Sequence, residues 1–336
     1  MGDLPEKEGT NAAPWLVPLS TRRVPTNQDK ELTGLEQLEV LIRDPSLPFQ
    51  ERLTVQVADT SYSKQAYLFG SAQNANLVTI ARLRSNRVFY QQPNQPLIAK
   101  RGHPKWYGER FALKEPDTWH SPDEVSETTY QSSRGRQYRV VIESWNNMLM
   151  KGTRSFKMHQ HPFTLVRIRY LNENGEPVFK HDLWLCVIGE RREELTLLQI
   201  YEAYQQRFDM EHYFRFGKQR LLMDSYQTPE LEREESWWDL VQLAYTQLWL
   251  AAPLAIAFPR PWETALKSKS TREPVKMTPT LVQRDFGRII RQIGTPARPP
   301  KVRHKSFGRR VGTKFPPRPR IPVVKKGKPP TLKAAA

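Results

Sequence analysis

Four polar residues at fixed spacing in the middle of the chain could perform chemistry together: Tyr204, Arg207, Glu211 and Lys218. They lie in a run from about residue 195 to 226 that contains no proline and a single glycine, which predicts one long helix. At about 100° per residue, the four side chains fall in one stripe roughly 21 Å long. Apolar residues share this side of the helix, so we expect the stripe to face the protein and not the solvent.

This stripe has two interpretations. A carboxylate among apolar neighbours needs a cation or a metal ion beside it, because its burial is otherwise costly. In the first interpretation, Arg207 and Lys218 are ion-pair partners of Glu211. In the second, Glu211 binds a metal ion, while Tyr204, Arg207 and Lys218 face an anion such as a DNA phosphate.

The spacing Tyr-x2-Arg-x3-Glu-x6-Lys resembles the signature around the last catalytic carboxylate of prokaryotic insertion-sequence DDE transposases. The resemblance implies a ribonuclease H-like catalytic domain, in which two Asp and one Glu hold two divalent ions, Mg²⁺ or Mn²⁺. Such a site cuts and rejoins DNA strands. The resemblance also implies double-stranded DNA at the element ends as partner, a homodimer when intact, no membrane partner, and a cytoplasmic, nucleoid-associated location.

Asp59 is the first candidate to join Glu211 in such a site. It ends a strand expected over residues 52–59, and a short helix is expected over residues 61–70. Ligand sites in sheets of this kind lie beyond the carboxyl ends of strands, and Mg²⁺ prefers carboxylate oxygens. The alternative is that Asp59 only caps the following helix. Taken with the Glu211 signature, we favour metal ligation by both residues.

The first Asp of the family's triad has no counterpart that we can assign. It should lie on a strand upstream of the strand expected at residues 14–20, where Asp3 stands in a polar stretch without strand character. Asp29 follows that strand, at the expected start of a helix. We therefore expect a transposase truncated at its N-terminus. Because Asp59 and Glu211 supply a charge of −2 against +4 on two ions, we expect the chain as written neither to cleave nor to join DNA.

The composition indicates a nucleic-acid partner. The 336 residues carry a formal net charge of +17, and no acidic residue follows Asp285. Such a balance is typical of proteins that bind nucleic acid or an anionic membrane surface. No apolar run approaches the roughly 20 residues of a spanning helix, which favours nucleic acid. The single cysteine, Cys186, permits no intrachain disulfide and is consistent with a reducing cytosol.

The order of the expected elements predicts an α/β fold. A strand, a helix and a strand over residues 52–83 form the pattern of parallel strands joined by a crossover. We expect a ribonuclease H-like mixed sheet with flanking helices, interrupted by a β-rich insertion before the Glu-bearing helix. The expected segments are a disordered start (1–13), the first part of the ribonuclease H-like domain without its first strand or strands (14–84), the β-rich insertion (85–190), the helical remainder of the catalytic domain (191–260), a linker with a small helix (261–293) and a disordered basic tail (294–336).

The expected insertion contains four tryptophans, and three of them are considered as base-stacking candidates. In several transposases of the resembling group, a tryptophan of the insertion stacks on a flipped base while a DNA hairpin forms. Trp145 and Trp184 lie in expected strands, and Trp106 lies in a basic loop. Because a tryptophan in a strand is more often a core residue, we assign none of the three to the site.

Three functions remain open at this point. The first is the catalytic domain of a DDE transposase, and the second is a DNA-binding relic that keeps the fold and the charge without activity. The third is an unrelated basic RNA-binding or ribosome-associated protein. The signature helix argues against the third, and a nuclease assay with Mg²⁺ or Mn²⁺ separates the first two.

Overall fold

The computed structural model describes residues 1–4, 13–93, 106–132, 134–257, 276–294 and 312. The chain divides into two compact units. The first unit comprises residues 1–2 and 28–211, and the second unit comprises residues 3–27 and 212–336. Within the described ranges, no helix is both long and apolar enough to cross a membrane. The predicted basic tail lies outside the described residues, except for residues 294 and 312.

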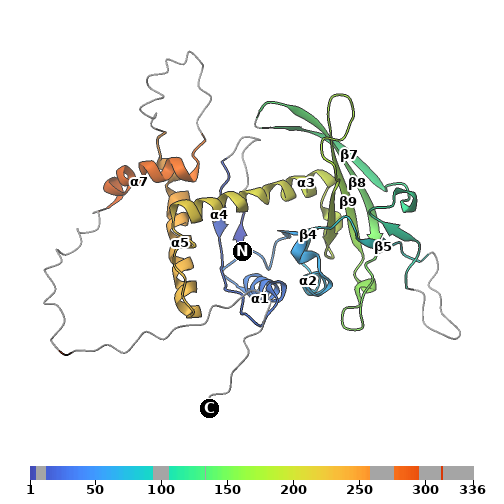
Figure 1. Ribbon diagram of the computed structural model, residues 1–336, viewed down its shortest axis with the longest axis horizontal. Coiled ribbons are helices and arrows are strands. Elements are labelled where there is room, and N and C mark those ends of the chain that lie inside the picture. Colours follow the sequence, from blue (N-terminus) through green and yellow to red (C-terminus); the bar gives the residue numbers. More distant parts are fainter. Residues whose placement is uncertain (5–12, 94–105, 133, 258–275, 295–311, 313–336) are drawn as a thin grey trace. The chain divides into compact units, whose positions relative to one another are not determined.

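A six-stranded sheet forms the centre of the first unit (Figure 1). Its strands follow the order β3-β4-β10-β9-β8-β7, in which β3 and β4 are parallel and every other neighbouring pair is antiparallel. This mixed sheet with flanking helices is compatible with a ribonuclease H-like fold. The segment expected as an insertion thus contributes strands to the same sheet as β3 and β4. The strands are β3 (Thr54–Ala58), β4 (Leu77–Arg82), β7 (Glu124–Gln131), β8 (Gln137–Met148), β9 (Phe163–Leu171) and β10 (Leu183–Ile188).

The parallel pair is joined by the crossover that the sequence predicts. Between β3 and β4 the chain passes through a 3-10 helix and then α2. Two parallel strands need such a connection because the chain must return to the same end of the sheet. The remaining elements of the first unit that precede its last helices are α1 (Lys30–Arg43), η1 (Thr60–Ser63), α2 (Gln65–Ser71), β5 (Val88–Tyr90), β6 (Arg110–Ala112), η2 (Pro116–Thr118), η3 (Met158–Gln160) and η4 (Arg192–Glu194).

Alternation along the strands separates the two faces of the sheet. Val78 and Ile80 of β4 lie in a buried cluster with residues of α3 (Leu197–Gln206), so α3 covers this face. Ala81 and Leu83 belong to the cluster on the opposite face. The separation follows from the pleat of the strand, in which successive side chains point to opposite sides.

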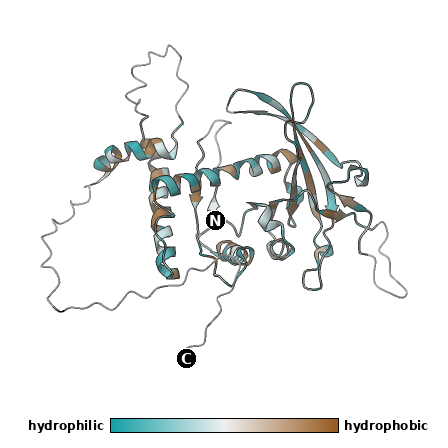
Figure 2. Ribbon diagram, viewed as in Figure 1, coloured by the Kyte–Doolittle hydropathy of each residue, from teal (hydrophilic) through white to brown (hydrophobic). Residues whose placement is uncertain are grey.

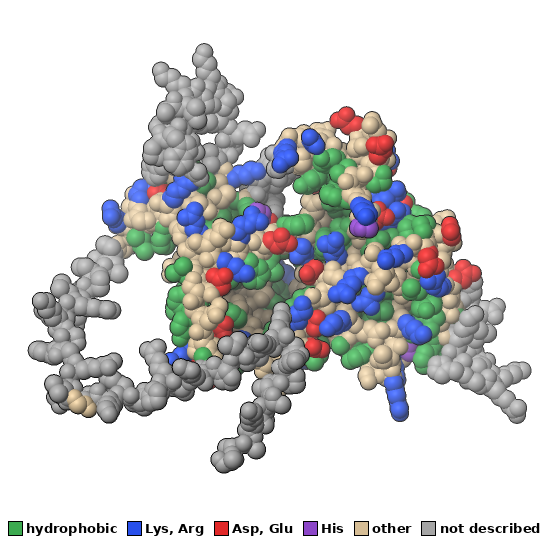
Figure 3. Space-filling model, viewed as in Figure 1, with side chains coloured by type: hydrophobic (Ala, Val, Ile, Leu, Met, Phe, Trp, Pro, Cys, Tyr) green, Lys and Arg blue, Asp and Glu red, His purple; other side chains and the backbone are tan. Residues whose placement is uncertain are grey.

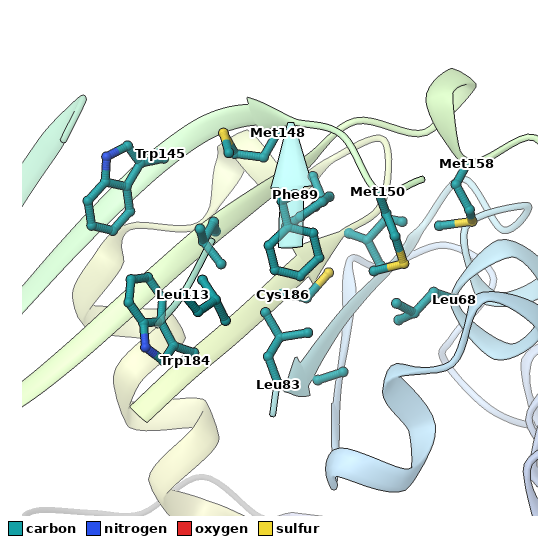
Figure 4. Packing of buried hydrophobic residues seen from close by; sticks show 14 of the residues in the cluster. Leu68, Leu83, Phe89, Leu113, Trp145, Met148, Met150, Met158, Trp184 and Cys186 are labelled. Atoms are coloured by element: carbon teal, nitrogen blue, oxygen red, sulfur yellow. The ribbon is translucent and has the colours of Figure 1, made fainter. Parts of the chain in front are cut away.

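The face opposite α3 carries a core rich in aromatic and sulfur-containing side chains (Figure 4). Trp145 of β8 and Trp184 of β10 pack there with ring centroids 5.7 Å apart, and each is almost fully buried. This confirms the interpretation of these two tryptophans as core residues. Cys186 of β10 is buried in the same cluster. Trp106, by contrast, is 39% exposed and stacks on His159 with ring centroids 4.0 Å apart.

The prediction of a single long helix from about residue 195 to 226 is wrong, because the structure has two helices there. α3 ends at Gln206, and α4 (Phe208–Arg220) begins after Arg207. α3 packs on the sheet, whereas α4 is more polar and continues into the second unit. Helix propensity and the absence of proline do not encode this break, because tertiary packing overrides the local preference.

The second unit is built around α5 (Leu231–Ala251), which is followed by η5 (Ala252–Leu254) and α7 (Pro279–Ile293). Trp15 donates its indole N–H to the carbonyl of Met277 at 2.9 Å. The Trp15 ring also packs edge-on against Tyr245 of α5, with centroids 5.6 Å apart. An early segment of the chain is thereby joined to helices from its C-terminal part. The two-residue strands β1 (Gly2–Asp3) and β2 (Val17–Pro18) complete the described elements.

Candidate active site

The carboxyl ends of β3 and β4 bring Asp59 and Arg82 to neighbouring positions. Val57 and Ile80 are partners in the parallel register, and both pack in the cluster covered by α3. Asp59 and Arg82 each lie two residues further along the chain, where side chains return to the same face. The end of the sheet therefore presents a carboxylate and a guanidinium side by side beneath α3. Both side chains belong to exposed residues.

Tyr204 completes this group from the helix above the sheet. It is 3% exposed and belongs to the cluster under α3. Burial raises the pKa of Tyr204, the charges of Arg207 and Arg82 lower it in part, and the carboxylate of Asp59 raises it further. These electrostatic effects show that the phenol, the carboxylate and both guanidinium groups share one neighbourhood.

Arg207 lies at the break between α3 and α4. Its guanidinium group is 5.7 Å from the centre of the Tyr204 ring and donates a hydrogen bond of 3.1 Å to Glu211. The Tyr204 hydroxyl and the Arg207 Nε are buried without a hydrogen bond of normal geometry to a described residue, although hydrogen bonding from Arg207 is one of the effects that lower the pKa of Tyr204. Buried polar groups in this condition call for an explanation, and a bound polar ligand is one.

Glu211 is less buried than the sequence predicts. Its side chain is 51% exposed, while that of Arg207 is 15% exposed. The expectation that the whole stripe faces the protein is therefore wrong for Glu211, which lies on α4, beyond the helix that packs on the sheet. The ion pair of the first interpretation does form between Arg207 and Glu211. At this exposure it contributes little to stability, and it involves only one oxygen of the carboxylate.

Lys218 lies further along α4 and is exposed. It belongs to the second unit, whereas Asp59, Arg82, Tyr204 and Arg207 belong to the first. The stripe is therefore divided between the two units. Lys218 is not part of the group that the first unit defines.

Asp59 also has the capping role that the alternative interpretation gave it. Its carboxylate accepts a hydrogen bond of 2.7 Å from the backbone N–H of Thr60, at the start of η1. Only one oxygen takes part in this bond, and the residue remains exposed at the strand end. Capping and metal ligation are thus geometrically compatible.

The sequence-predicted metal ligands of this region carry oxygen donors, the type that a hard divalent ion prefers. Among the residues that the structure describes, no group of three or more His, Cys, Asp and Glu is placed to hold a metal ion. The candidate donors are the carboxylates of Asp59 and Glu211, whose hard oxygens suit Mg²⁺ or Mn²⁺ better than Zn²⁺. Two carboxylates alone would leave water to fill most of the coordination shell.

Arg82 is the residue that the sequence reasoning missed. Its guanidinium group forms no ion pair or hydrogen bond with the described part of the chain, although it lies beside Asp59 and Tyr204. A signal was present, because Arg82 follows the buried run of β4 at the position that corresponds to Asp59 after β3. Using that signal requires the register of β3 on β4, which cannot be derived from the sequence.

Comparison with known proteins finds one family model that matches part of the chain. Residues 10–146 match the family model described as DDE superfamily endonuclease. The match covers less than half of the chain; it includes Asp59 and Arg82 and ends before Tyr204. No curated protein matches the chain. The match supports a DDE-type transposase or nuclease family for this protein.

Proposed function

We propose that this protein is a DDE-type DNA transposase of an insertion sequence, in which Asp59 and Glu211 are two of the metal-binding carboxylates. The observation that carries the proposal is the convergence of Asp59, Arg82, Tyr204 and Arg207 beyond the carboxyl ends of β3 and β4. Open α/β sheets bind their ligands at such ends. Glu211 is connected to this group through its ion pair with Arg207.

In this proposal the basic and phenolic groups hold the DNA backbone. Arg82 and Arg207 donate to phosphate oxygens, for which a planar guanidinium is well suited. Tyrosine is protonated at neutral pH, and the raised pKa of Tyr204 strengthens this, so its hydroxyl can donate. In a site with its third carboxylate, two Mg²⁺ or Mn²⁺ ions would activate the attacking water or 3′-hydroxyl and stabilise the leaving oxygen. Lys218 is proposed as a further phosphate-binding residue, on the spacing of the signature alone.

The proposed substrate is double-stranded DNA at the ends of a mobile element. The net charge of +17 supports a polyanionic partner. A homodimer in the cytoplasm, associated with the nucleoid, is the proposed form in which the DNA is bound.

Arg82→Gln is expected to weaken DNA binding about equally for all sequences and to lower the slope of log K against log[salt] by about 1. Arg82→Lys should lie in between, because it keeps the charge and loses the fork. Arg136→Gln is the matched control, since it removes the same charge from an exposed position beside β8, which is four strands away from β3. Equal salt slopes for Arg82→Gln and Arg136→Gln would contradict a phosphate contact by Arg82.

Supercoiled DNA that carries the element ends is expected to stay intact with this chain in Mn²⁺. Asp59 and Glu211 together balance half of the charge of two divalent ions, so nucleophile activation and leaving-group stabilisation do not operate together. The assay compares the chain with Glu211→Gln on the same DNA. Nicking by the unmodified chain that disappears in Glu211→Gln would overturn this expectation and assign activity to the site.

A non-catalytic DNA-binding relic is the second candidate. It is favoured by the ion pair between Arg207 and Glu211, which engages the carboxylate without a metal ion. A relic would bind DNA with a strong salt dependence, and neither Asp59→Asn nor Glu211→Gln would alter its affinity for Mn²⁺. Metal affinity therefore distinguishes the two candidates even where no cleavage is seen.

A further inference from the structure

Helix α7 is amphipathic, and its apolar side is already occupied. At about 100° per residue, Val282 and Ile289 fall on one side of the helix, and both are fully buried. α7 contacts α5 and η5 within the second unit, which accounts for this burial. Hydrophobic and hydrophilic residues alternate along α7 accordingly (Figure 2).

The opposite side of α7 carries arginines. Arg284, Arg288 and Arg291 follow one another at intervals of four and three residues, so they lie in one stripe. Lys and Arg side chains gather over α7 in the space-filling view (Figure 3). Thr280 and Gly287 share the stripe, and no acidic side chain lies on it. The stripe therefore presents a continuous positive face.

The one acidic residue of α7 is turned inward. Asp285 is 3% exposed and accepts a hydrogen bond of 2.8 Å from the backbone N–H of Ile256. It also binds the guanidinium of Arg288, which in turn donates to the carbonyl of Leu254 at 2.8 Å. This network fixes the rotation of α7 in the second unit. It also partly neutralises Arg288.

Arg284 and Arg291 remain available for a partner. Both are exposed, and neither side chain forms an ion pair or hydrogen bond with a residue that the structure describes. They are two helical turns apart, roughly 10.5 Å along the axis, so they would reach separate anionic groups. Two exposed arginines on one helix face can therefore contact two phosphates of an extended polyanion.

Gly287 lies on the same face between these two arginines. Glycine is unfavourable in the middle of a helix. Gly287 does not adopt the left-handed backbone conformation that would favour glycine. A Cβ placed on Gly287 would meet nothing within 4 Å, so packing within the protein does not require glycine. A missing side chain at this position lets a partner's backbone approach the helix closely.

We propose that the Arg284–Arg291 face of α7 is a second nucleic-acid contact, which binds the phosphate backbone of duplex DNA without reading its sequence. The identity of the polyanion as DNA rests on the proposed function; the contact itself does not require the metal site. Amphipathic basic helices also bind anionic membranes by burying their apolar side. That side of α7 is packed against α5 and η5, so DNA is the favoured partner.

The test is duplex binding by the full chain across a salt series. The double variant Arg284→Gln/Arg291→Gln is expected to bind more weakly and to lower the slope of log K against log[salt] by about 2, which is about 1 for each lost contact. The control is Arg22→Gln/Arg233→Gln, which removes the same charge from exposed positions of the second unit outside α7. Equal slopes for the two double variants would overturn the proposal.

A steric variant tests the same face without a change of charge. Gly287→Gln is expected to raise thermal stability, because it adds helix propensity in open space, and yet to weaken DNA binding. Unchanged binding would contradict close approach at this face. The remaining arm measures binding of the full chain to vesicles of phosphatidylcholine and phosphatidylserine in equal parts. Stronger binding to these vesicles than to duplex DNA would overturn the choice of DNA as the partner.

Failure of this inference is distinguishable from failure of the proposed function. If Asp59→Asn loses Mn²⁺ while the Arg284/Arg291 variant binds DNA normally, the α7 contact is wrong and the metal site stands. If the α7 variant loses DNA while Asp59→Asn keeps Mn²⁺, the contact stands and the metal site is wrong.

Discussion

Replacing Asp59 with asparagine is expected to lower the affinity of the protein for Mn²⁺ by at least about tenfold, a change of about 1.4 kcal/mol. The substitution removes one of two proposed carboxylate ligands from the end of β3. Asparagine can still accept the hydrogen bond from the Thr60 N–H, since Asn and Asp are equally good caps. The fold should therefore be unchanged while the charge is lost. Titration of the full chain with Mn²⁺, followed by electron paramagnetic resonance, measures the effect.

The same variant separates the two interpretations of Asp59. If Asp59 only caps η1, Asp59→Asn is silent, whereas Asp59→Ala loses about 1 kcal/mol of stability. If it binds metal, both variants lose Mn²⁺. Asp117→Asn is the matched control, because Asp117 is an exposed residue at the start of another 3-10 helix of the first unit. A Kd for Mn²⁺ that is equal in wild type, Asp59→Asn and Glu211→Gln would refute the metal site.

Trp145→Ala is expected to destabilise the first unit by about 3–5 kcal/mol. Trp145 is the largest fully buried side chain among the residues that the structure describes, and its indole N–H donates to the carbonyl of His120 at 2.8 Å. It also packs against Phe111 and Trp184, with ring centroids 5.2 Å and 5.7 Å away. Truncation would leave a cavity in the core and remove the hydrogen bond to the partly buried carbonyl of His120.

Urea unfolding followed by circular dichroism measures this change. Because the chain forms two compact units, the transition of the first unit must be resolved from that of the second. Trp106→Ala is the control, since Trp106 is 39% exposed and stacks on the ring of His159. That stacking is worth about 0.5–1.5 kcal/mol at most. A loss below about 1 kcal/mol for Trp145→Ala would show that the aromatic cluster does not hold the core together.

Much of the local structure could be read from the sequence because it depends on residues close together in the chain. Alternating β-branched residues predict β3 and β4, and the helical stretch between them predicts the parallel crossover. Asp59 could be singled out as a candidate metal ligand or helix cap because the expected end of a strand and the expected start of a helix meet at this residue. The apolar and arginine-bearing sides of α7 follow from the period of 3.6 residues in the same way.

The arrangement around the candidate site required contacts between distant segments. Arg82 lies beside Asp59 only because the register of β3 on β4 pairs Val57 with Ile80. The helix is interrupted at Arg207, after the part that packs on the sheet as α3, and no residue type in the run marks that position.

The sequence by itself determined the charge of the protein and the type of many local elements, and it singled out Asp59 and Glu211 as candidate metal ligands. Tertiary structure alone decided that β7 to β10 extend the sheet of β3 and β4, that Glu211 is half-exposed, and that Lys218 belongs to another unit. The physical reason is the distance along the chain over which each interaction acts. Propensity and periodicity act over a few residues, whereas strand register and burial depend on which distant surfaces exclude water from one another.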